Sequence, residues 1–278
     1  MRMMPPKLGI IAGGGDLPRE LIAECRRTDR DYFVVALKGH ADSNTVLNSP
    51  HEWVRLGAAG RSIRVLRREG VTEVVLAGAV ARPSLFQLCP DFWTVLFFIQ
   101  SGVANKGDNS LLQALVNTLE TKEGFGVVGV HTLLPSLLAR TGVLSSKGPD
   151  SGSNEDIRVA WAAALELGAS DLGQSVVVRN GLVLARETAS GTAAMLASIS
   201  PDERGMATGV LVKVSKPGQE QRADLPTIGP NTIAQVAKAG LAGIAIEADQ
   251  SIILNKNETI SAANDAGIFL DVRSGSEI

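Results

Sequence analysis

Apolar runs alternate with helix-patterned segments along the first half of the chain. The runs typical of buried strands are residues 7–12, 32–37, 74–77 and 126–130. The segments with apolar residues at helical spacing are 17–27, 61–68, 90–100 and 109–123. Because strands that are apolar throughout are buried on both faces, this order predicts a parallel sheet covered by helices on both sides. The first half is therefore expected to be a Rossmann-like α/β domain.

The pattern changes after Leu144. Residues 145–154 are polar, contain Gly and Pro and lack periodicity, so they are interpreted as a linker. Two β-runs joined at Asn180-Gly181 predict a hairpin over 176–184. The other elements expected here are helices at 155–167, 231–239 and 258–265 and strands at 209–214, 252–254 and 268–272. We therefore expect a Rossmann-like domain (1–144), a linker (145–154) and a mixed α/β catalytic domain (155–278).

Composition excludes several classes of protein. The chain has 278 residues, 45% of them hydrophobic and 20% charged, which suits two folded domains. A net charge of -2 gives no electrostatic case for binding nucleic acid. With two cysteines, Cys25 and Cys89, neither a disulfide framework nor a Cys-based zinc site is expected, and a reduced cytoplasmic setting follows.

No segment has the pattern of a signal peptide or a membrane span. The longest strongly apolar run, residues 92–99, falls far short of the ~20 residues that a spanning helix needs. Core packing is the simpler interpretation of this aromatic-rich run. An apolar wall or exposed patch for acyl chains or a membrane face is the alternative.

Residues 213–229 are the strongest candidate for a site. This loop carries the cations Lys213, Lys216 and Arg222, the carboxylate of Asp224, and four Pro or Gly residues, and it ends where an apolar helix pattern begins. Such a loop can aim backbone N–H groups and point charges at an anion, phosphate above all. Asp224 would then hold a divalent cation or accept a proton from an attacking water.

Residues 13–18 contain three consecutive glycines but fail the test for a dinucleotide fingerprint. Pro18 occupies the place of the third glycine, and no acidic residue follows at the distance of a ribose ligand. We expect neither a nicotinamide nor a flavin cofactor. Both a tight structural turn and a substrate-facing loop account for the glycines. Similarly, Asp108 or Asn109 could be an N-cap of the next helix, whereas the preceding Lys106-Gly107 favours function.

Several motifs together resemble one family. They are Lys213-x-x-Lys216-Pro217-x-Gln219, Arg222-x-Asp224-Leu225-Pro226-Thr227-Ile228-Gly229, residues 11–18, Lys106-Gly107-Asp108, residues 171–178 and residues 239–244. In these motifs the chain resembles the UDP-2,3-diacylglucosamine pyrophosphatases (LpxI), which split UDP-2,3-diacylglucosamine into UMP and 2,3-diacylglucosamine 1-phosphate (lipid X) in lipid A biosynthesis. The resemblance extends over nearly the whole chain.

The resemblance implies a site and its partners. Asp224 is the expected catalytic residue and a ligand of Mg²⁺ or another divalent cation, with Glu187 and Glu247 as further candidate ligands. The expected substrate-binding residues are Gly13, Gly14, Gly15, Asp16, Gly78, Lys106, Gly107, Asp108, His131, Gln174, Lys213, Lys216, Arg222, Thr227 and Ile228. A lone histidine such as His131 is otherwise more often structural. The expected partners are an acylated UDP-sugar lying between the two domains, the inner face of the inner membrane as a peripheral surface, and a second copy in a homodimer.

One departure from the family pattern bears on activity. Where relatives run through an acidic Glu-Gly-Thr-Asp segment, this chain has Ser190-Gly191-Thr192-Ala193. If those carboxylates serve catalysis, the chain is slower, uses Glu187 instead, or is a non-catalytic binder of a nucleotide-sugar or phospholipid. If they only cap the following helix, nothing is lost. A transferase that needs a second substrate is a third hypothesis.

Overall fold

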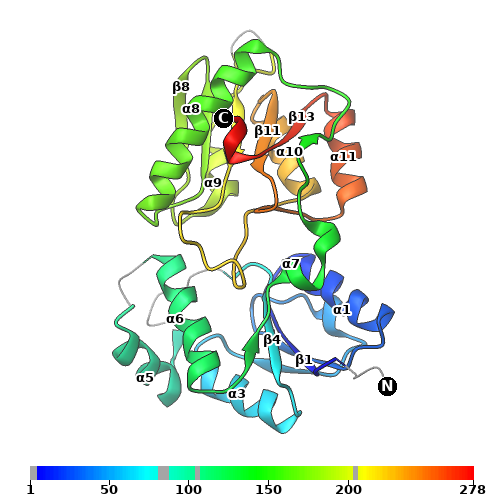
Figure 1. Ribbon diagram of the computed structural model, residues 1–278, viewed down its shortest axis with the longest axis vertical. Helices are drawn as coiled ribbons and strands as arrows, with labels where there is room; N and C mark the ends of the chain where they lie inside the picture. Colours follow the sequence, from blue (N-terminus) through cyan, green and yellow to red (C-terminus); the bar gives the residue numbers. More distant parts are fainter. Residues whose placement is uncertain (1–4, 81–87, 104–106, 203–205) are drawn as a thin grey trace. The chain divides into compact units, whose positions relative to one another are not determined.

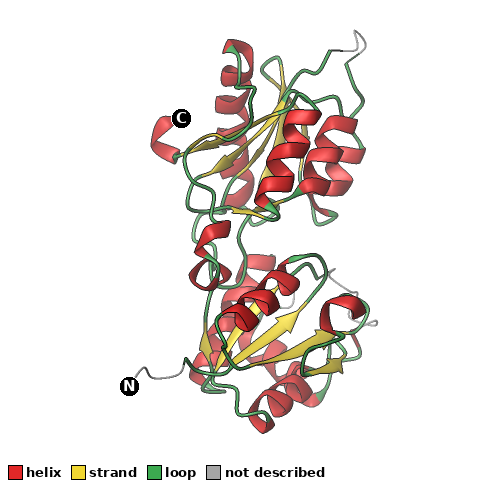
Figure 2. Ribbon diagram, turned by 90° about the vertical axis from the view of Figure 1, so that its right-hand side faces the viewer, coloured by secondary structure: helices red, strands yellow, loops and turns green. Residues whose placement is uncertain are grey.

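The structure is a computed structural model that describes residues 5–80, 88–103, 107–202 and 206–278. The chain divides into two compact units (Figures 1 and 2). The first unit comprises Met1–Pro135 together with the short segment Glu220–Asp224, and the second comprises Ser136–Gln219 and Leu225–Ile278.

The first unit contains a five-stranded, fully parallel sheet with the order β3-β2-β1-β4-β5. Its strands are β1 (Leu8–Ala12), β2 (Tyr32–Leu37), β3 (His51–Val54), β4 (Glu73–Ala77) and β5 (Gly126–Val127). The helices are α1 (Leu17–Arg27), α2 (Ser43–Val46), α3 (Ala59–Arg68), α5 (Phe92–Ser101), α6 (Asp108–Thr121) and α7 (Val130–Leu133). The predicted parallel α/β fold is confirmed.

The order of these strands reverses next to β1. β2 and β3 extend the sheet on one side of β1, whereas β4 and β5 extend it on the other. All five carboxyl ends lie at the same edge because all pairings are parallel. In open α/β sheets, ligands bind outside the carboxyl ends of the strands at such a reversal. This edge is therefore where a small-molecule site is expected in the first unit.

The second unit contains a six-stranded mixed sheet with the order β6-β13-β11-β9-β7-β8. Its strands are β6 (Gly142–Val143), β7 (Ser175–Arg179), β8 (Leu182–Arg186), β9 (Val210–Lys213), β11 (Gly243–Glu247) and β13 (Phe269–Arg273). β9, β11 and β13 are parallel, and the others pair antiparallel. A separate parallel pair joins β10 (Thr227–Ile228) to β12 (Ile252–Ile253). The predicted mixed α/β organisation is confirmed.

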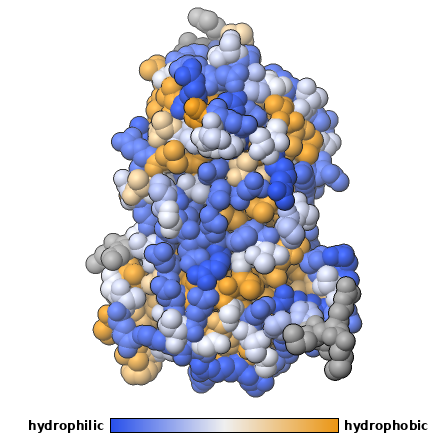
Figure 3. All heavy atoms as spheres, in the orientation of Figure 1, coloured by the Kyte–Doolittle hydropathy of each residue, from blue (hydrophilic) through white to orange (hydrophobic). Residues whose placement is uncertain are grey.

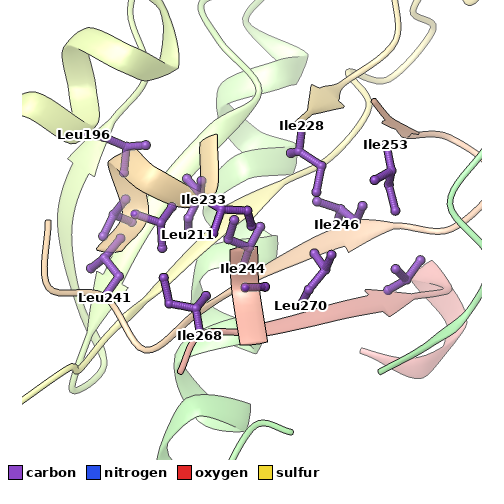
Figure 4. Close-up of a cluster of buried hydrophobic side chains, with 14 of the residues drawn as sticks. Leu196, Leu211, Ile228, Ile233, Leu241, Ile244, Ile246, Ile253, Ile268 and Leu270 are labelled. Atoms are coloured by element: carbon purple, nitrogen blue, oxygen red, sulfur yellow. The ribbon is translucent and has the colours of Figure 1, made fainter. Parts of the chain in front are cut away.

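Helices cover both faces of the second sheet. α8 (Ser151–Ala169) packs on one face, where Trp161 lies among the valines of β7 and β9. On the other face, α9 (Gly191–Ala197), α10 (Pro230–Lys238) and α11 (Lys256–Asp265) enclose an aliphatic cluster around Leu211, Ile233 and Ile244 (Figure 4). Successive residues of β7, β9, β11 and β13 enter opposite clusters, as the two-residue period of a strand requires.

The predicted hairpin has the turn that its sequence indicates. Asn180 and Gly181 both have positive φ, 53° and 75°, the left-handed conformation that a two-residue turn between right-twisted strands requires. The buried carboxylate of Asp156 accepts hydrogen bonds from both backbone N–H groups, at 3.1 and 2.6 Å.

Residues 145–154, interpreted as a linker, lie inside the second unit. The chain pairs β6 with β13 before this segment, and the Ser145 hydroxyl accepts a 2.7 Å hydrogen bond from the Leu270 N–H. α8 begins earlier than expected, at Ser151, because Asp150 caps it by accepting the Ser153 N–H at 2.7 Å. The polarity of the segment thus reflects capping and edge pairing, and the units divide at Pro135–Ser136 instead.

The apolar run 92–99 lies in a helix, α5, that has one buried side and one exposed side. In α5, Thr94 and Phe97 are buried, whereas Phe92 is 79% and Ile99 71% exposed. Core packing therefore accounts for only half of the run. Within the described parts of the chain, no helix is both long and apolar enough to cross a membrane.

Candidate functional site

The glycine turn after β1 packs directly against the turn after β4. The Gly13 N–H donates to the Ala77 carbonyl at 2.8 Å, and Gly14 and Ala79 exchange two 2.8 Å backbone hydrogen bonds. A Cβ on Gly78, where φ is +91°, would lie 2.4 Å from the Gly14 carbonyl oxygen. Close approach of the two backbones therefore explains Gly13, Gly14 and Gly78, so the structural interpretation holds for these glycines whether or not they also contact a ligand.

The same turns lie at the reversal point between β1 and β4. Gly15 has φ +85° and faces open space, and Asp16 stands at the N-cap position of α1. The Asp16 carboxylate makes no side-chain cap bond; it pairs with Arg19 at 2.8 Å. Four of the predicted substrate-binding positions, Gly13 to Asp16, thus meet a fifth, Gly78, at the carboxyl edge of the sheet.

His131 lies in α7, directly after β5. Its ring folds over Gly129, where a Cβ would lie 2.3 Å from Cε1 of the imidazole. The Nδ1 atom is buried and has no hydrogen-bond partner among the described residues. A buried ring nitrogen without a partner is costly, which favours a ligand or water contact over a purely structural role.

The segment Glu220–Asp224 forms a turn that belongs to the first unit. The Glu220 N–H donates to Oδ1 of Asn109, in the first turn of α6, at 2.9 Å. Arg222 makes a two-pronged contact with Glu220, at 2.8 and 2.9 Å, and a third bond to Glu120 at 2.8 Å. The Asp224 N–H closes the turn on the Glu220 carbonyl at 3.0 Å. Asp224, half-buried, thus follows a turn fixed at two points along α6.

These contacts occupy the Arg222 guanidinium. Hydrogen bonding to Glu220 raises the pKa of Arg222 further above its ordinary value, and the same contact lowers the pKa of Glu220. Arg222 was predicted to bind substrate; in the structure its guanidinium contacts Glu220 and Glu120 and so holds the turn in place. Asp224 was expected in the second domain, yet it is grouped with the first.

The N-terminus of α6 differs from expectation. Gly107 is the N-cap residue and Asp108 is the first helical residue, so neither Asp108 nor Asn109 takes the N-cap position that was the alternative to a functional role. The Asn109 side chain binds the Glu220 backbone instead. Lys106 lies outside the described residues.

A second group of polar side chains lies at one edge of the mixed sheet. Lys213 ends β9 and Glu187 directly follows β8, and each is only 8% exposed. Thr192 joins them: its hydroxyl contacts the Glu187 Oε1 at 2.5 Å, and the Lys213 ammonium donates to it at 2.9 Å. The other Glu187 oxygen accepts the Gln174 N–H at 2.9 Å. Burial raises the pKa of Glu187, but the charge of Lys213 and these hydrogen bonds outweigh burial, so this pKa lies below its ordinary value.

The contacts of the acidic residues do not assemble a metal centre. Both oxygens of Glu187 accept hydrogen bonds within the second unit, and Glu247 accepts the Ser215 N–H at 2.9 Å. Over the described ranges, no group of three or more His, Cys, Asp or Glu side chains is placed to hold a metal ion. Glu187 and Glu247 therefore fit the role of metal ligands poorly.

The remaining predicted residues have partners inside the second unit. Lys216 pairs with Asp171 at 2.8 Å, and the Gln174 side chain contacts Gln219 at 3.4 Å. The Thr227 hydroxyl donates to the Leu225 carbonyl at 2.9 Å. Ile228 is 1% exposed and lies in the aliphatic cluster, so its side chain is not accessible to a substrate.

The departure at residues 190–193 falls on the start of a short helix. Ser190 occupies the N-cap position of α9, and Ala193 lies in its first turn. Carboxylates at these places would interact with the helix dipole, which favours a capping role for the acids of relatives. Thr192, which the two patterns share, carries the contact between Glu187 and Lys213. Sequence reasoning missed this contact of Thr192 because it considered only the missing charges.

Comparison with known proteins extends over both units. The model of the LpxI N-terminal domain matches residues 7–137, and that of the LpxI C-terminal domain matches residues 140–271. The chain is also 41% identical over 271 residues to the UDP-2,3-diacylglucosamine pyrophosphatase LpxI of Caulobacter vibrioides. That match covers 95% of this chain and 96% of the relative.

Proposed function

The chain belongs to the LpxI family, and from this premise we propose that it hydrolyses the pyrophosphate of UDP-2,3-diacylglucosamine in lipid A biosynthesis. The products would be UMP and 2,3-diacylglucosamine 1-phosphate, lipid X. The observation that carries this proposal is the end-to-end match to a relative of that name, which spans both units.

Asp224 is the residue to which we assign the chemistry. In this reaction a water oxygen bonds to the phosphorus nearer the diacylglucosamine, the P–O–P bridge breaks, and UMP leaves with the bridging oxygen. A carboxylate that accepts the water's proton or orients the water typically contributes about 10²–10⁴-fold to the rate. The turn that precedes Asp224 is fixed by Asn109 and by the Arg222 ion pairs, which supports a preorganised carboxylate.

We assign diphosphate binding to the carboxyl edge of the first sheet. Gly13–Asp16 and Gly78 lie there at the strand reversal. His131 adds a buried Nδ1 that has no hydrogen-bond partner among the described residues. Lys213, Lys216 and Arg222 were predicted as direct phosphate ligands. Their carboxylate or hydroxyl partners favour a different role, in which Lys213 and Lys216 hold segments of the second unit and Arg222 fixes the turn that precedes Asp224.

A divalent cation, Mg²⁺ in the first place, is part of the proposal. Mg²⁺ is usually held by one or two carboxylates plus substrate phosphates and keeps several waters. Asp224 with the diphosphate fits this donor set, whereas Glu187, whose two oxygens are already bonded, does not. When bound there, the ion would neutralise charge on the phosphates. Loss of UMP release on chelation, restored by added Mg²⁺, tests this point.

We further propose that the enzyme works in the cytoplasm at the inner face of the inner membrane, where an acylated sugar nucleotide would be found. The test of the function is direct. Purified full-length protein is mixed with detergent-dispersed UDP-2,3-diacylglucosamine and Mg²⁺, and UMP is followed. Steady release of UMP without any second substrate is expected. Tight binding without product would identify a binding protein, and turnover only with an added acceptor would identify a transferase.

A further inference from the structure

One side of α5 is an exposed, uncharged apolar face. Phe92, Val95 and Ile99 are 79%, 38% and 71% exposed, and Leu96 is half-buried beside them. Their spacing of three, four and seven residues places them on one side of the helix. Figure 3 shows hydrophobic atoms at the lower left, over α5. No residue of this helix carries a charge.

The opposite side of α5 is firmly attached. Asp91 caps the helix by accepting the Thr94 N–H at 2.9 Å and also accepts the Arg61 N–H at 3.2 Å. The Thr94 hydroxyl donates to the Gly57 carbonyl at 2.9 Å, and the Trp93 indole donates to Glu123 at 2.7 Å. The exposed face therefore belongs to a helix attached to α3 and to the segment that follows α6, and its apolar side chains point outward.

Cations lie on the segments that contact α5. α3, which holds the start of α5, carries four arginines and no acid in its sequence AGRSIRVLRR. Arg64 contacts only the Gly60 carbonyl among the described residues. At the other end of α5, the Lys122 ammonium contacts the neutral Gln100 side chain at 2.6 Å. Arg64 and Lys122, on segments that contact α5, thus have no carboxylate partner in the described parts of the chain.

We propose that the face formed by Phe92, Val95, Leu96 and Ile99, assisted by Arg64 and Lys122 of the segments that contact α5, docks the protein onto an anionic lipid bilayer. A ten-residue helix cannot span a membrane, so it would lie in the plane of the interface with its apolar side among the acyl chains. Arginine and lysine on these segments complement anionic headgroups. This docking role rests on the proposed function, because a diacylated substrate has to be taken from a membrane.

Vesicle binding by the full-length protein tests the docking face. Phosphatidylglycerol-rich vesicles and pure phosphatidylcholine vesicles are pelleted with wild type and with the double variant Phe92→Glu, Ile99→Glu. Removing two inserted side chains should weaken partitioning to the anionic vesicles at least about 100-fold. The matched control Leu47→Glu, at a side chain that is 69% exposed elsewhere in the first unit, should bind like wild type. Arg64→Gln and Lys122→Gln should each cost about fivefold, and only at low salt.

Three results would overturn the docking face. They are wild type that ignores anionic vesicles, a double variant that binds them normally, and a double variant that turns a wild-type dimer into a monomer in sedimentation. UMP release from detergent-dispersed substrate separates acyl-chain binding from membrane docking. The rate of UMP release should be the same in the double variant as in wild type. A double variant that releases UMP more slowly but still binds vesicles would also overturn the proposal. If no form releases UMP while vesicle binding follows expectation, the proposed function fails and the docking face stands.

Discussion

Oδ1 of Asn109 accepts a 2.9 Å hydrogen bond from the backbone N–H of Glu220, across a sequence separation of 111 residues. This bond attaches the turn that leads to Asp224 to the first helical turn of α6, in the other half of the sequence. Together with the Arg222 contacts to Glu220 and Glu120, it determines where the carboxylate to which we assign the chemistry can lie.

Asn109→Ala should lower kcat by about tenfold, since small misplacements of a catalytic group cost up to about 10²-fold in rate. Asn109→Asp keeps an acceptor for the Glu220 N–H and should retain most of the activity. Asn117→Ala, an exposed position on the same helix, is the matched control. Steady-state kinetics of the three variants checks this, and equal activity of Asn109→Ala and Asn117→Ala would show that the hydrogen bond does not position Asp224.

Arg222 and Glu120 should be energetically coupled. Both side chains are about a third exposed, 36% and 34%, so a double-mutant cycle with Arg222→Ala and Glu120→Gln should give a coupling of only about 0.2–1 kcal/mol in the free energy of unfolding. The fall in kcat of Arg222→Ala should be larger than this coupling predicts, because the turn before Asp224 loses the contacts that hold it in place. A cycle in which activity changes no more than stability would argue against a positioning role.

The buried Glu187–Thr192–Lys213 network should make stability depend on pH. The pKa of Glu187 is lowered in the folded protein, so its stabilising contribution is present above the unfolded value of 4.5 and disappears as the pH falls through the folded value. Glu187→Gln should therefore be less stable than wild type at pH 7, and the difference should shrink below about pH 4. Urea unfolding at several pH values measures this, and a difference that does not change with pH would contradict it.

Thr192→Val probes the same network without changing its charge. Removing the hydroxyl leaves a buried carboxylate oxygen and a buried ammonium each short of one partner, which should cost about 1–3 kcal/mol. Thr192→Ser keeps the hydroxyl and should be close to wild type. Unfolding free energies at pH 7 compare the two, and similar losses for both would assign the effect to the methyl group.

Gly78→Ala should be markedly more destabilising than Gly39→Ala. Both glycines have positive φ, +91° and +80°, but only at Gly78 would the added Cβ meet a backbone oxygen, at 2.4 Å. Strain alone costs about 1–3 kcal/mol at a non-glycine residue of this conformation. Thermal unfolding of the two variants separates strain from the clash, and equal losses would show that the two turns can move apart.

Part of the fold was predictable because it depends on local sequence patterns. Apolar runs and helical spacing identify most elements of the first sheet, and Asn180-Gly181 specifies its turn because both positions need positive φ. The boundary between the units was not predictable. Residues 145–154 are polar because of helix capping and edge pairing, and in a sequence this polarity looks the same as that of a linker.

The candidate site was predictable in its residues and less so in its arrangement. Gly13–Asp16 and Gly78 meet because parallel strands end at one edge, which strand order implies. The placement of Asp224 with the first unit depends on Asn109, and the role of Thr192 depends on two side chains brought close because β8 and β9 both pair antiparallel with β7. Neither the Asn109–Glu220 contact nor the contacts of Thr192 can be predicted from the spacing of residues along the chain.

Asp224→Asn gives the most direct test of the proposed hydrolysis. The variant keeps the size and most hydrogen-bonding ability of the side chain but removes its charge. UMP release from UDP-2,3-diacylglucosamine with Mg²⁺ is compared for this variant and wild type, and substrate binding is measured separately by calorimetry. We predict a fall in kcat of about 10²-fold or more with the protein folded and still binding substrate. Wild-type rates of UMP release from the variant would contradict the assignment of Asp224 and the mechanism built on it.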